Sequence, residues 1–156
     1  MKTIIKDNWL DKDLALYLEN YFLYDFPHYY GHKSNEEDKQ FFYNSVLNPN
    51  DALNKFLFDK LKKTLNKNLK LERMYINIQH PNMSGSFHTD DGDITCLYMV
   101  TKTNKNSGSF EIKNEQKIDF IQNRLIAFNA KKIHRGLAPE DGTRITLAFK
   151  TFSDIL

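Results

Sequence analysis

The spacing of apolar residues changes at about Leu69, and this change limits the folds that the chain can adopt. Beyond it come short runs rich in β-branched and aromatic residues, separated by clusters of Asn, Gly, Ser and Asp, which is the pattern of β-strands. The runs are residues 74–78, 94–100, 109–112, 124–128 and 144–149. No segment of helical periodicity lies between them, so antiparallel pairing is favoured over the helix-linked strands of a parallel sheet. The second half therefore predicts a barrel or jelly roll.

The first half contains two segments with the period of amphipathic helices. The first begins after Asp11, a residue type that caps helices, and has on one face Leu14, Tyr17, Leu18 and Tyr21. The second follows residues 48–51 and has on one stripe Leu53, Phe56, Leu57, Leu61 and Leu65. We expect the aromatic members, Tyr17, Tyr21 and Phe56, to lie in the core. The predicted fold is α+β and mainly β, with two N-terminal helices supporting the β core.

The segment 24–40 between the two helices mixes Pro, Gly, His, aromatic pairs and acidic residues. This composition predicts a long loop or a hairpin with a polar tip. Loops of this length in compact domains are often lids or binding segments. Tyr29 and Tyr30 are therefore candidate contacts for a peptide substrate.

Composition favours one domain over residues 1–156, because a chain with 40% hydrophobic residues and no linker or repeat can bury a single substantial core. The net charge of +2, from 22 basic and 20 acidic residues, gives no strong signal for a nucleic-acid partner. A single cysteine, Cys96, excludes a disulfide framework. Without a signal peptide or an apolar run of about 20 residues, we expect a cytoplasmic protein with no membrane partner. The sequence indicates no particular oligomeric state.

The triplet His88-Thr89-Asp90 is the first candidate for chemistry. Residues i and i+2 of an extended segment point to the same face, so the imidazole and the carboxylate can converge on one metal ion. His134, just beyond the run that ends at Phe128, offers a third ligand. Two histidines and one carboxylate that leave the opposite coordination positions open are the ligand set of non-haem Fe(II) oxygenases. The alternative is a solvated acidic turn or a stray Ca²⁺ site, because Asp91 and Asp93 follow closely.

Arg144 begins the last strand-like run, ten residues after His134. It is one of four arginines in a chain that otherwise uses Lys for its positive charges. A guanidinium can hold the far carboxylate of a metal-chelating 2-oxoglutarate with two parallel hydrogen bonds. Thr146 lies two residues on, on the same face of a strand, where its hydroxyl can donate to that carboxylate. An ordinary salt bridge is the alternative for Arg144.

These motifs resemble the Fe(II)/2-oxoglutarate-dependent oxygenase superfamily, and most of all its prolyl 4-hydroxylase-like branch. The resemblance covers residues 75–152 and rests on His88-Thr89-Asp90, His134 and Arg144-Ile145-Thr146. It implies a double-stranded β-helix, and it implies Fe(II) as cofactor with 2-oxoglutarate and O₂ as cosubstrates, succinate and CO₂ being the co-products. It makes His88, Asp90 and His134 the iron ligands and catalytic residues, and Arg144 the clamp for 2-oxoglutarate.

The remaining positions match the family less well. Gln79 stands at one place where prolyl hydroxylases commonly have a Tyr, and it can still donate a hydrogen bond to the cosubstrate. Met99 aligns with a second family Tyr, whereas Tyr98 is expected to face the other way. Leu97 and Phe110 are expected to form apolar walls of the cosubstrate pocket.

The resemblance implies a dioxygenase that hydroxylates a protein or peptide, with proline as the candidate target. Two other functions remain open at this point. One is a hydroxylase or demethylase of a small molecule or nucleobase in the same superfamily; no second Arg follows Arg144, which disfavours a nucleic-acid demethylase. The other is a non-catalytic, cupin-like module that binds a metal.

Overall fold

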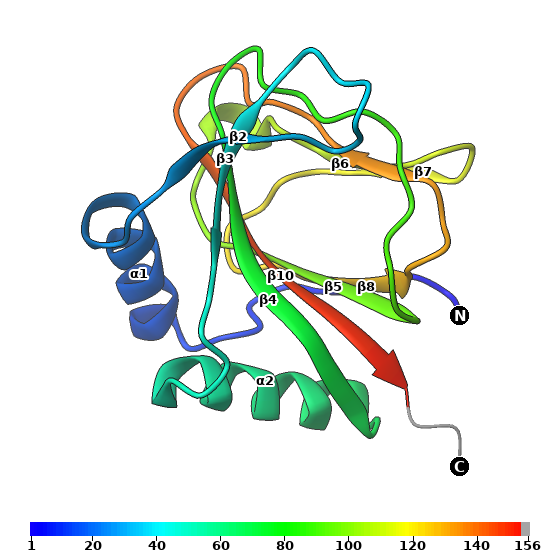
Figure 1. The fold of residues 1–156 in the computed structure, drawn as a ribbon. Coiled ribbons are helices and arrows are strands. Elements are labelled where there is room, and N and C mark those ends of the chain that lie inside the picture. The colour runs from blue at the N-terminus through cyan, green and yellow to red at the C-terminus, as the bar shows by residue number, and fades with distance from the viewer. Residues whose placement is uncertain (154–156) are drawn as a thin grey trace.

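A computed structural model of the chain describes residues 1–153, which form mainly β-strands with two α-helices (Figure 1). The elements are β1 (Ile4–Lys6), α1 (Lys12–Asn20), the π-helical η1 (Tyr21–Asp25), β2 (Tyr29–His32), β3 (Phe42–Val46), α2 (Ala52–Leu65), β4 (Leu69–Gln79), β5 (Ile94–Met99), the 3₁₀ turn η2 (Asn104–Asn106), β6 (Phe110–Ile112), β7 (Gln116–Ile118), β8 (Leu125–Asn129), β9 (His134–Gly136) and β10 (Arg144–Ser153). All five predicted strands are present. None of the helices in the described part of the chain is long and apolar enough to cross a membrane.

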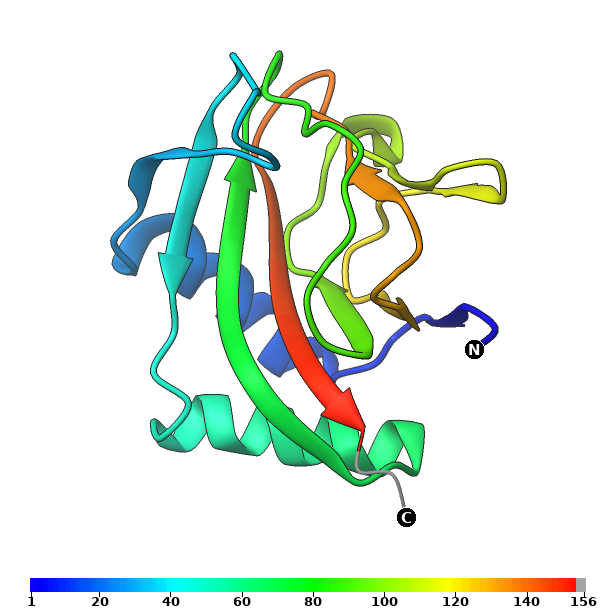
Figure 2. The ribbon, with the colours of Figure 1, turned by 45° about the vertical axis from the view of Figure 1, so that its right-hand side comes forward.

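The strands form two sheets that face each other (Figure 1). The larger sheet has the order β1-β8-β5-β10-β4-β3-β2, and the smaller one has the order β7-β6-β9. All the strand pairs are antiparallel. The long strands β4 and β10 run side by side through the middle of the larger sheet (Figure 2). This double-stranded β-helix is the architecture that the sequence predicted.

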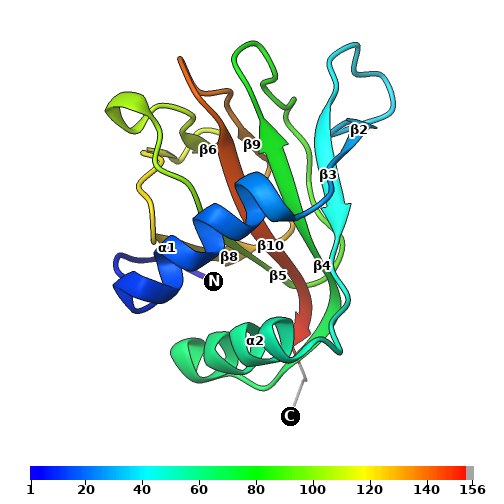
Figure 3. The same cartoon turned by 90° about the vertical axis from the view of Figure 1, so that its left-hand side faces the viewer.

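The two helices cover one face of the larger sheet (Figure 3). The alternation along β10 shows how that face is built: Ile145, Leu147 and Phe149 are buried in the cluster that includes Leu18 of α1 and Leu57 of α2. The intervening residues of β10 point to the other face, toward the smaller sheet. One face of the sheet therefore forms the main core, and the opposite face is left to form a site.

The prediction that Tyr17 and Phe56 lie in the core is wrong, because these side chains are 54% and 52% exposed. Each helix presents only a narrow stripe to the sheet, and that stripe is filled by smaller side chains such as Leu18 and Leu61. Tyr17 lies at the edge of the stripe and stacks on Tyr21, which is partly buried, with 5.9 Å between the ring centroids.

Of the two structures predicted for the segment 24–40, a long loop or a hairpin, the hairpin is found, because β2 pairs with β3. Its polar tip is organised by the Asp38 carboxylate, which accepts hydrogen bonds from the backbone N–H groups of Ser34 and Asn35, both at 3.1 Å. The same carboxylate accepts a 2.8 Å bond from the hydroxyl of Ser86. The tip of the hairpin is thereby attached to the segment that leads to His88.

Candidate metal and cosubstrate site

His88 and His134 come from segments far apart in the sequence, and the backbone holds them together. His134 begins β9, while His88 lies in the connection between β4 and β5. The two residues form an isolated antiparallel bridge, with backbone N–H to carbonyl distances of 3.0 and 2.9 Å in the two directions. Side chains of residues paired in this way leave the backbone on the same face. The ring centroids are accordingly 4.5 Å apart.

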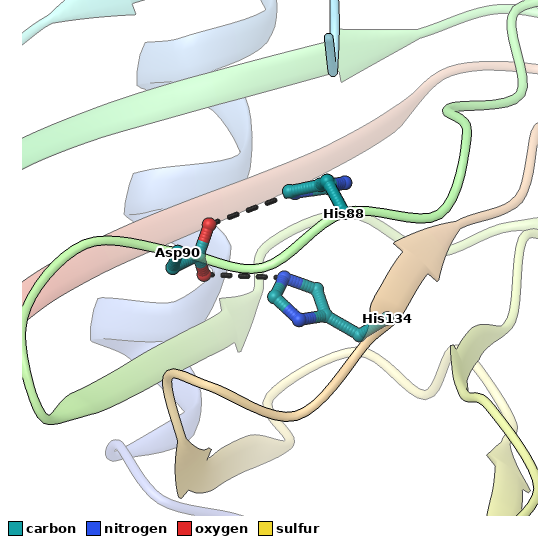
Figure 4. A group of neighbouring side chains, drawn as sticks. All are labelled: His88, Asp90 and His134. Carbon is teal, nitrogen blue, oxygen red and sulfur yellow. Dashed lines mark ion pairs between the residues drawn. The ribbon is translucent and has the colours of Figure 1, made fainter.

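Asp90 completes a group of three side chains that point toward one another (Figure 4). Its Oδ2 is 3.1 Å from Nε2 of His134, and its Oδ1 is 3.6 Å from Nε2 of His88. One ligand atom from each residue lies within 4.8 Å of the other two. Asp90 and His134 are buried, whereas the side chain of His88 is 25% exposed. The geometry brings together the three residues that the sequence assigned to the metal.

In each histidine, the hydrogen bond made by Nδ1 shows which of the two ring nitrogens is available to bind a metal. Nδ1 of His88 is 2.9 Å from the carbonyl oxygen of Ser86, and Nδ1 of His134 is 2.7 Å from that of Lys132. A carbonyl oxygen only accepts, so Nδ1 carries a proton in each ring and Nε2 is the nitrogen that can bind a metal. Nε2 is also the atom that faces Asp90. Imidazoles oriented in this way by a backbone carbonyl are typical of metal ligands.

Asp90 is held in its ionised form. Burial would raise the pKa of this carboxyl, but the hydrogen bonds and charges of His134 and Lys150 outweigh burial and hold the pKa below its usual range. Oδ2 accepts a 2.7 Å hydrogen bond from Thr95 and forms an ion pair with Lys150. Burial also lowers the pKa of His88, which keeps the imidazole neutral. Asp90 and His88 are thus in the protonation state that metal binding requires.

Arg144 is fully buried beside this group without a carboxylate partner among residues 1–153. Its Nε donates to the carbonyl oxygen of Gly108 and its Nη1 to Oε1 of Gln79, both at 2.6 Å. Burial without a compensating anion lowers its pKa to about 9. A buried charge of this kind is costly unless a counter-ion pairs with it. The site therefore fits a ligand that brings its own carboxylate.

Gly108 is required for this placement of Arg144. Its φ is +87°, and a Cβ at this position would lie 2.8 Å from Cδ of Arg144. A larger residue would collide with the side chain and strain the backbone. The absence of a side chain at Gly108 thus lets the backbone approach the arginine closely enough for its carbonyl to accept from Nε.

A cavity joins the histidine and arginine parts of the site. Its lining residues are Ser34, Phe42, Tyr75, Asn77, Gln79, Gly85, His88, Leu97, Phe110, His134, Gly136, Arg144, Thr146 and Lys150. Leu97, Phe110 and Thr146 lie where the sequence placed them, next to the clamp and the ligands. Asp90 does not line the cavity; its carboxylate faces Nε2 of both histidines.

Three predictions about the pocket can be compared with the structure, and two of them differ from it. Met99 does not line the cavity, since it packs in the apolar cluster behind it and its sulfur accepts from the N–H of Ile121 at 3.3 Å. Gln79 lines the cavity, but its amide donates to the carbonyl oxygens of Met83 and Gly136, at 2.7 and 3.2 Å, so its role is to orient Arg144. Tyr98 faces the helices, as expected.

The two candidate substrate residues lie outside the cavity. Tyr29 and Tyr30 are in β2, 67% and 62% exposed. Tyr30 packs against Tyr43 with 5.2 Å between the ring centroids, on the face of the hairpin turned toward the helices. Tyr29 pairs with Asn44 and therefore shares the face of the sheet that carries the site.

Sequence reasoning missed Tyr75, Asn77 and Lys150, which also line the cavity. The signal was present as strand parity: Tyr75 and Asn77 alternate with Gln79 along β4, and Lys150 is an even number of residues beyond Arg144 on β10. The alternation of side chains along a strand indicates which face a residue lies on. It does not indicate whether a charged side chain on that face is buried. Lys150, only 2% exposed, is the main surprise of the site.

Known structures share this fold. Neither a protein-family model nor a curated protein sequence matches the chain. A viral collagen prolyl hydroxylase from Paramecium bursaria Chlorella virus-1, in complex with 2-oxoglutarate, has a TM-score of 0.75 at 13% identity over 100% of this chain and 97% of that one. A prolyl hydroxylase from Trichoplax adhaerens, in complex with a peptide fragment of the hypoxia inducible factor oxygen degradation domain, has a TM-score of 0.75 at 13% identity, with 96% and 83% covered.

The carbocyclase SnoK of nogalamycin biosynthesis, described as non-haem and α-ketoglutarate dependent, has a TM-score of 0.70 at 9% identity, with 97% of this chain and 79% of that one covered. The similar structures thus include hydroxylases with peptide substrates and enzymes of small-molecule biosynthesis. At these identities the likeness concerns the fold. The chain has the double-stranded β-helix fold of the Fe(II)/2-oxoglutarate-dependent oxygenases.

Proposed function

We propose that this chain, as a single domain over residues 1–156, is an Fe(II)- and 2-oxoglutarate-dependent oxygenase. The observation that carries the proposal is the buried, carboxylate-free Arg144 in the same cavity as the histidine ligands. A structural metal would explain the His-Asp-His group alone, but it would leave the unpaired guanidinium without a purpose. A dicarboxylic acid that reaches from the metal to Arg144 accounts for both features.

Each residue has a defined part in this reaction. His88, Asp90 and His134 would hold the iron, which supplies the activation of O₂ when it is bound. Arg144 would hold the far carboxylate of 2-oxoglutarate, and the Gln79 amide and the Gly108 carbonyl keep the guanidinium aimed at the cavity. Leu97 and Phe110 would exclude water from the cosubstrate. The Nδ1–H groups of His88 and His134 donate to backbone carbonyls, which leaves Nε2 of each ring to face the metal position.

We infer that the substrate is a protein or peptide, with proline as the first target to test. This inference is supported by the similar structures that are prolyl hydroxylases, one of them with a bound peptide fragment. The hairpin of β2 and β3, whose residues Ser34 and Phe42 line the cavity, would cover a bound peptide. A small-molecule substrate is the second candidate, because SnoK shares the fold. A reducing, cytoplasmic setting suits an iron that must stay ferrous.

The experiment is anaerobic titration of the metal-free protein with Fe(II) and 2-oxoglutarate, followed by visible spectroscopy. Chelation of 2-oxoglutarate to the iron should produce a weak charge-transfer band, and exposure to O₂ should then release succinate. The variant His88→Ala should give neither, whereas His28→Ala, which changes a histidine outside the cavity, should behave like the unaltered protein. A folded protein that forms no band, or that forms it equally well with His88→Ala, would refute the proposal.

A further inference from the structure

Lys150 is a buried cation that the proposed chemistry does not use. It lies on the same face of β10 as Arg144 and lines the same cavity, 2% exposed. Its ammonium group forms an ion pair with Asp90 and donates to Oγ1 of Thr95 at 3.4 Å. An ammonium has three N–H donors. These two partners therefore leave a third donor for a molecule in the cavity.

The charges of the loaded site do not balance without a further anion. A divalent iron held by Asp90, a doubly charged 2-oxoglutarate and the guanidinium of Arg144 together make a neutral set. Asp90, the ion-pair partner of Lys150 among the described residues, is already part of that set. The ammonium of Lys150 therefore adds one uncompensated positive charge to a buried site. Such a charge is costly unless an anion reaches it.

A groove beside the cavity extends this positive region. It is lined by His32, Asn44, Val46, Arg73 and Tyr75. Tyr75 also lines the cavity, so the groove and the cavity adjoin at this residue. The guanidinium of Arg73 lies 5.6 Å and the ammonium of Lys150 5.8 Å from the centroid of its ring. The groove is therefore continuous with the part of the site where Lys150 lies.

Arg73 and Lys150 are directly opposite each other on the paired strands β4 and β10. Like charges at such positions are unfavourable in the absence of a counter-ion. The partner of Arg73 is Asp91, at 3.7 Å, and both side chains are largely exposed, so this pair is weak. Arg73 is therefore available to a ligand that enters along the groove.

We propose that the substrate carries a carboxylate that binds between Lys150 and Arg73, next to the carbon that is oxidised. This inference rests on the proposed oxygenase function and narrows its substrate to acidic molecules. The acid can belong to the oxidised unit itself or to a neighbouring residue of a peptide. In both cases the ammonium of Lys150 donates its remaining N–H to the carboxylate. The guanidinium of Arg73 binds the same carboxylate from the side of the groove.

Binding of matched acid and amide probes tests the proposal without turnover. The unaltered protein is loaded with Mn(II) and saturating 2-oxoglutarate, and their dissociation constants are measured first by calorimetry. N-acetyl-L-proline is then compared with N-acetyl-L-prolinamide, and acetyl-Pro-Asp-amide with acetyl-Pro-Asn-amide. The first pair tests an acid on the oxidised unit and the second an acid on a neighbour. We expect at least one acid to bind about 10- to 100-fold more tightly than its amide.

Two variants locate the effect. Lys150→Met keeps the length of the side chain without its charge and should abolish the preference for the acid. Lys131→Met is the matched control: Lys131 also contacts Asp90, through the backbone carbonyl at 3.2 Å, but does not line the cavity, and the preference should remain. Arg73→Gln should reduce the preference by a smaller factor, because Arg73 is half exposed.

The outcomes separate this inference from the proposed function. If the unaltered protein binds neither Mn(II) nor 2-oxoglutarate, the oxygenase function and the inference both fail. If it binds both, yet neither acid is preferred over its amide, only the inference fails. If Lys150→Met weakens the binding of 2-oxoglutarate and leaves the preference for the acid unchanged, Lys150 serves the cosubstrate and the inference is again overturned. Because the first comparison uses the unaltered protein, it stands even if a variant does not fold.

Discussion

Replacement of Arg144 by methionine should weaken the binding of 2-oxoglutarate about 100-fold while leaving the protein folded. In the proposed complex the guanidinium donates two charge-assisted hydrogen bonds to the far carboxylate of the cosubstrate. Together these are worth about 3 kcal/mol, which corresponds to an increase in Kd on the order of 100-fold. Arg144→Lys keeps the charge but loses the planar pair of donors, so we expect an intermediate loss of about tenfold.

The stability of the metal-free Arg144→Met variant follows from two opposing effects. The substitution would leave the carbonyl of Gly108 and Oε1 of Gln79 without their donor, and each loss costs about 1 to 3 kcal/mol. Removal of a buried guanidinium that has no carboxylate partner relieves a penalty of similar size, as the lowered pKa of Arg144, about 9, indicates. The free energy of unfolding should therefore change by less than about 2 kcal/mol.

Isothermal titration of 2-oxoglutarate into the Mn(II)-loaded protein measures the affinity, and urea denaturation of the metal-free protein measures the stability. Arg124→Met is the matched control, because Arg124 pairs with Asp7 at 2.5 Å and does not line the cavity. It should leave the affinity unchanged. The assignment of Arg144 is wrong if the folded Arg144→Met variant binds 2-oxoglutarate within about fivefold of the unaltered protein.

Three further changes test other parts of the structure. Asp90→Asn should remove Mn(II) binding and, because it leaves Lys150 buried without its counter-charge, lower the free energy of unfolding by about 3 kcal/mol in urea denaturation. The metal-free protein should lose stability as the pH falls below 6.5, because burial lowers the pKa of His88 in the folded protein and the unfolded chain therefore binds the proton more readily. The free energy of unfolding, measured by urea denaturation, should be lower at pH 5 than at pH 7. His88→Gln should reduce this difference. Asn123→Ala should cost about 3 kcal/mol, since its side chain bonds both backbone groups of Leu10 and the hydroxyl of Tyr98, and unchanged denaturation would contradict this role.

The sequence was sufficient for the long strands and for the residues that share their faces. The apolar runs of β4, β5, β8 and β10 are long enough for strand periodicity to be read, and residue parity placed Thr146 beside Arg144. The strands β1, β7 and β9 were not predicted; each has only three residues, as has β6, whose flanking turn residues made its run recognisable. β9 forms because His134 bridges to His88 and pairs with β6, contacts made only in the folded chain.

The errors at the site have a similar cause. Met99 lies two residues after Leu97, so both side chains are on the same face of β5. Whether Met99 reaches the cavity or packs behind it depends on the register of β5 against β10, which the sequence does not contain. Gln79 has the right face, yet neighbouring backbone carbonyls from residues 83 and 136 take its donors. Lys150 was overlooked because a lysine near the end of a strand is usually solvated. Here Lys150 lines the cavity and is paired with the buried Asp90.

Strand β10 couples the site to the core. Ile145, Leu147 and Phe149 are fully buried against the helices, while Arg144 and Lys150 project into the cavity from the other face. A shift of one residue against β4 would place two charges in the apolar core and three apolar side chains in the site. The burial of those three side chains, each worth about 1.5 to 3 kcal/mol, therefore holds both cations in position. The register of β10 against β4 therefore fixes, beside Arg144, a second buried cation, Lys150, which is paired with Asp90.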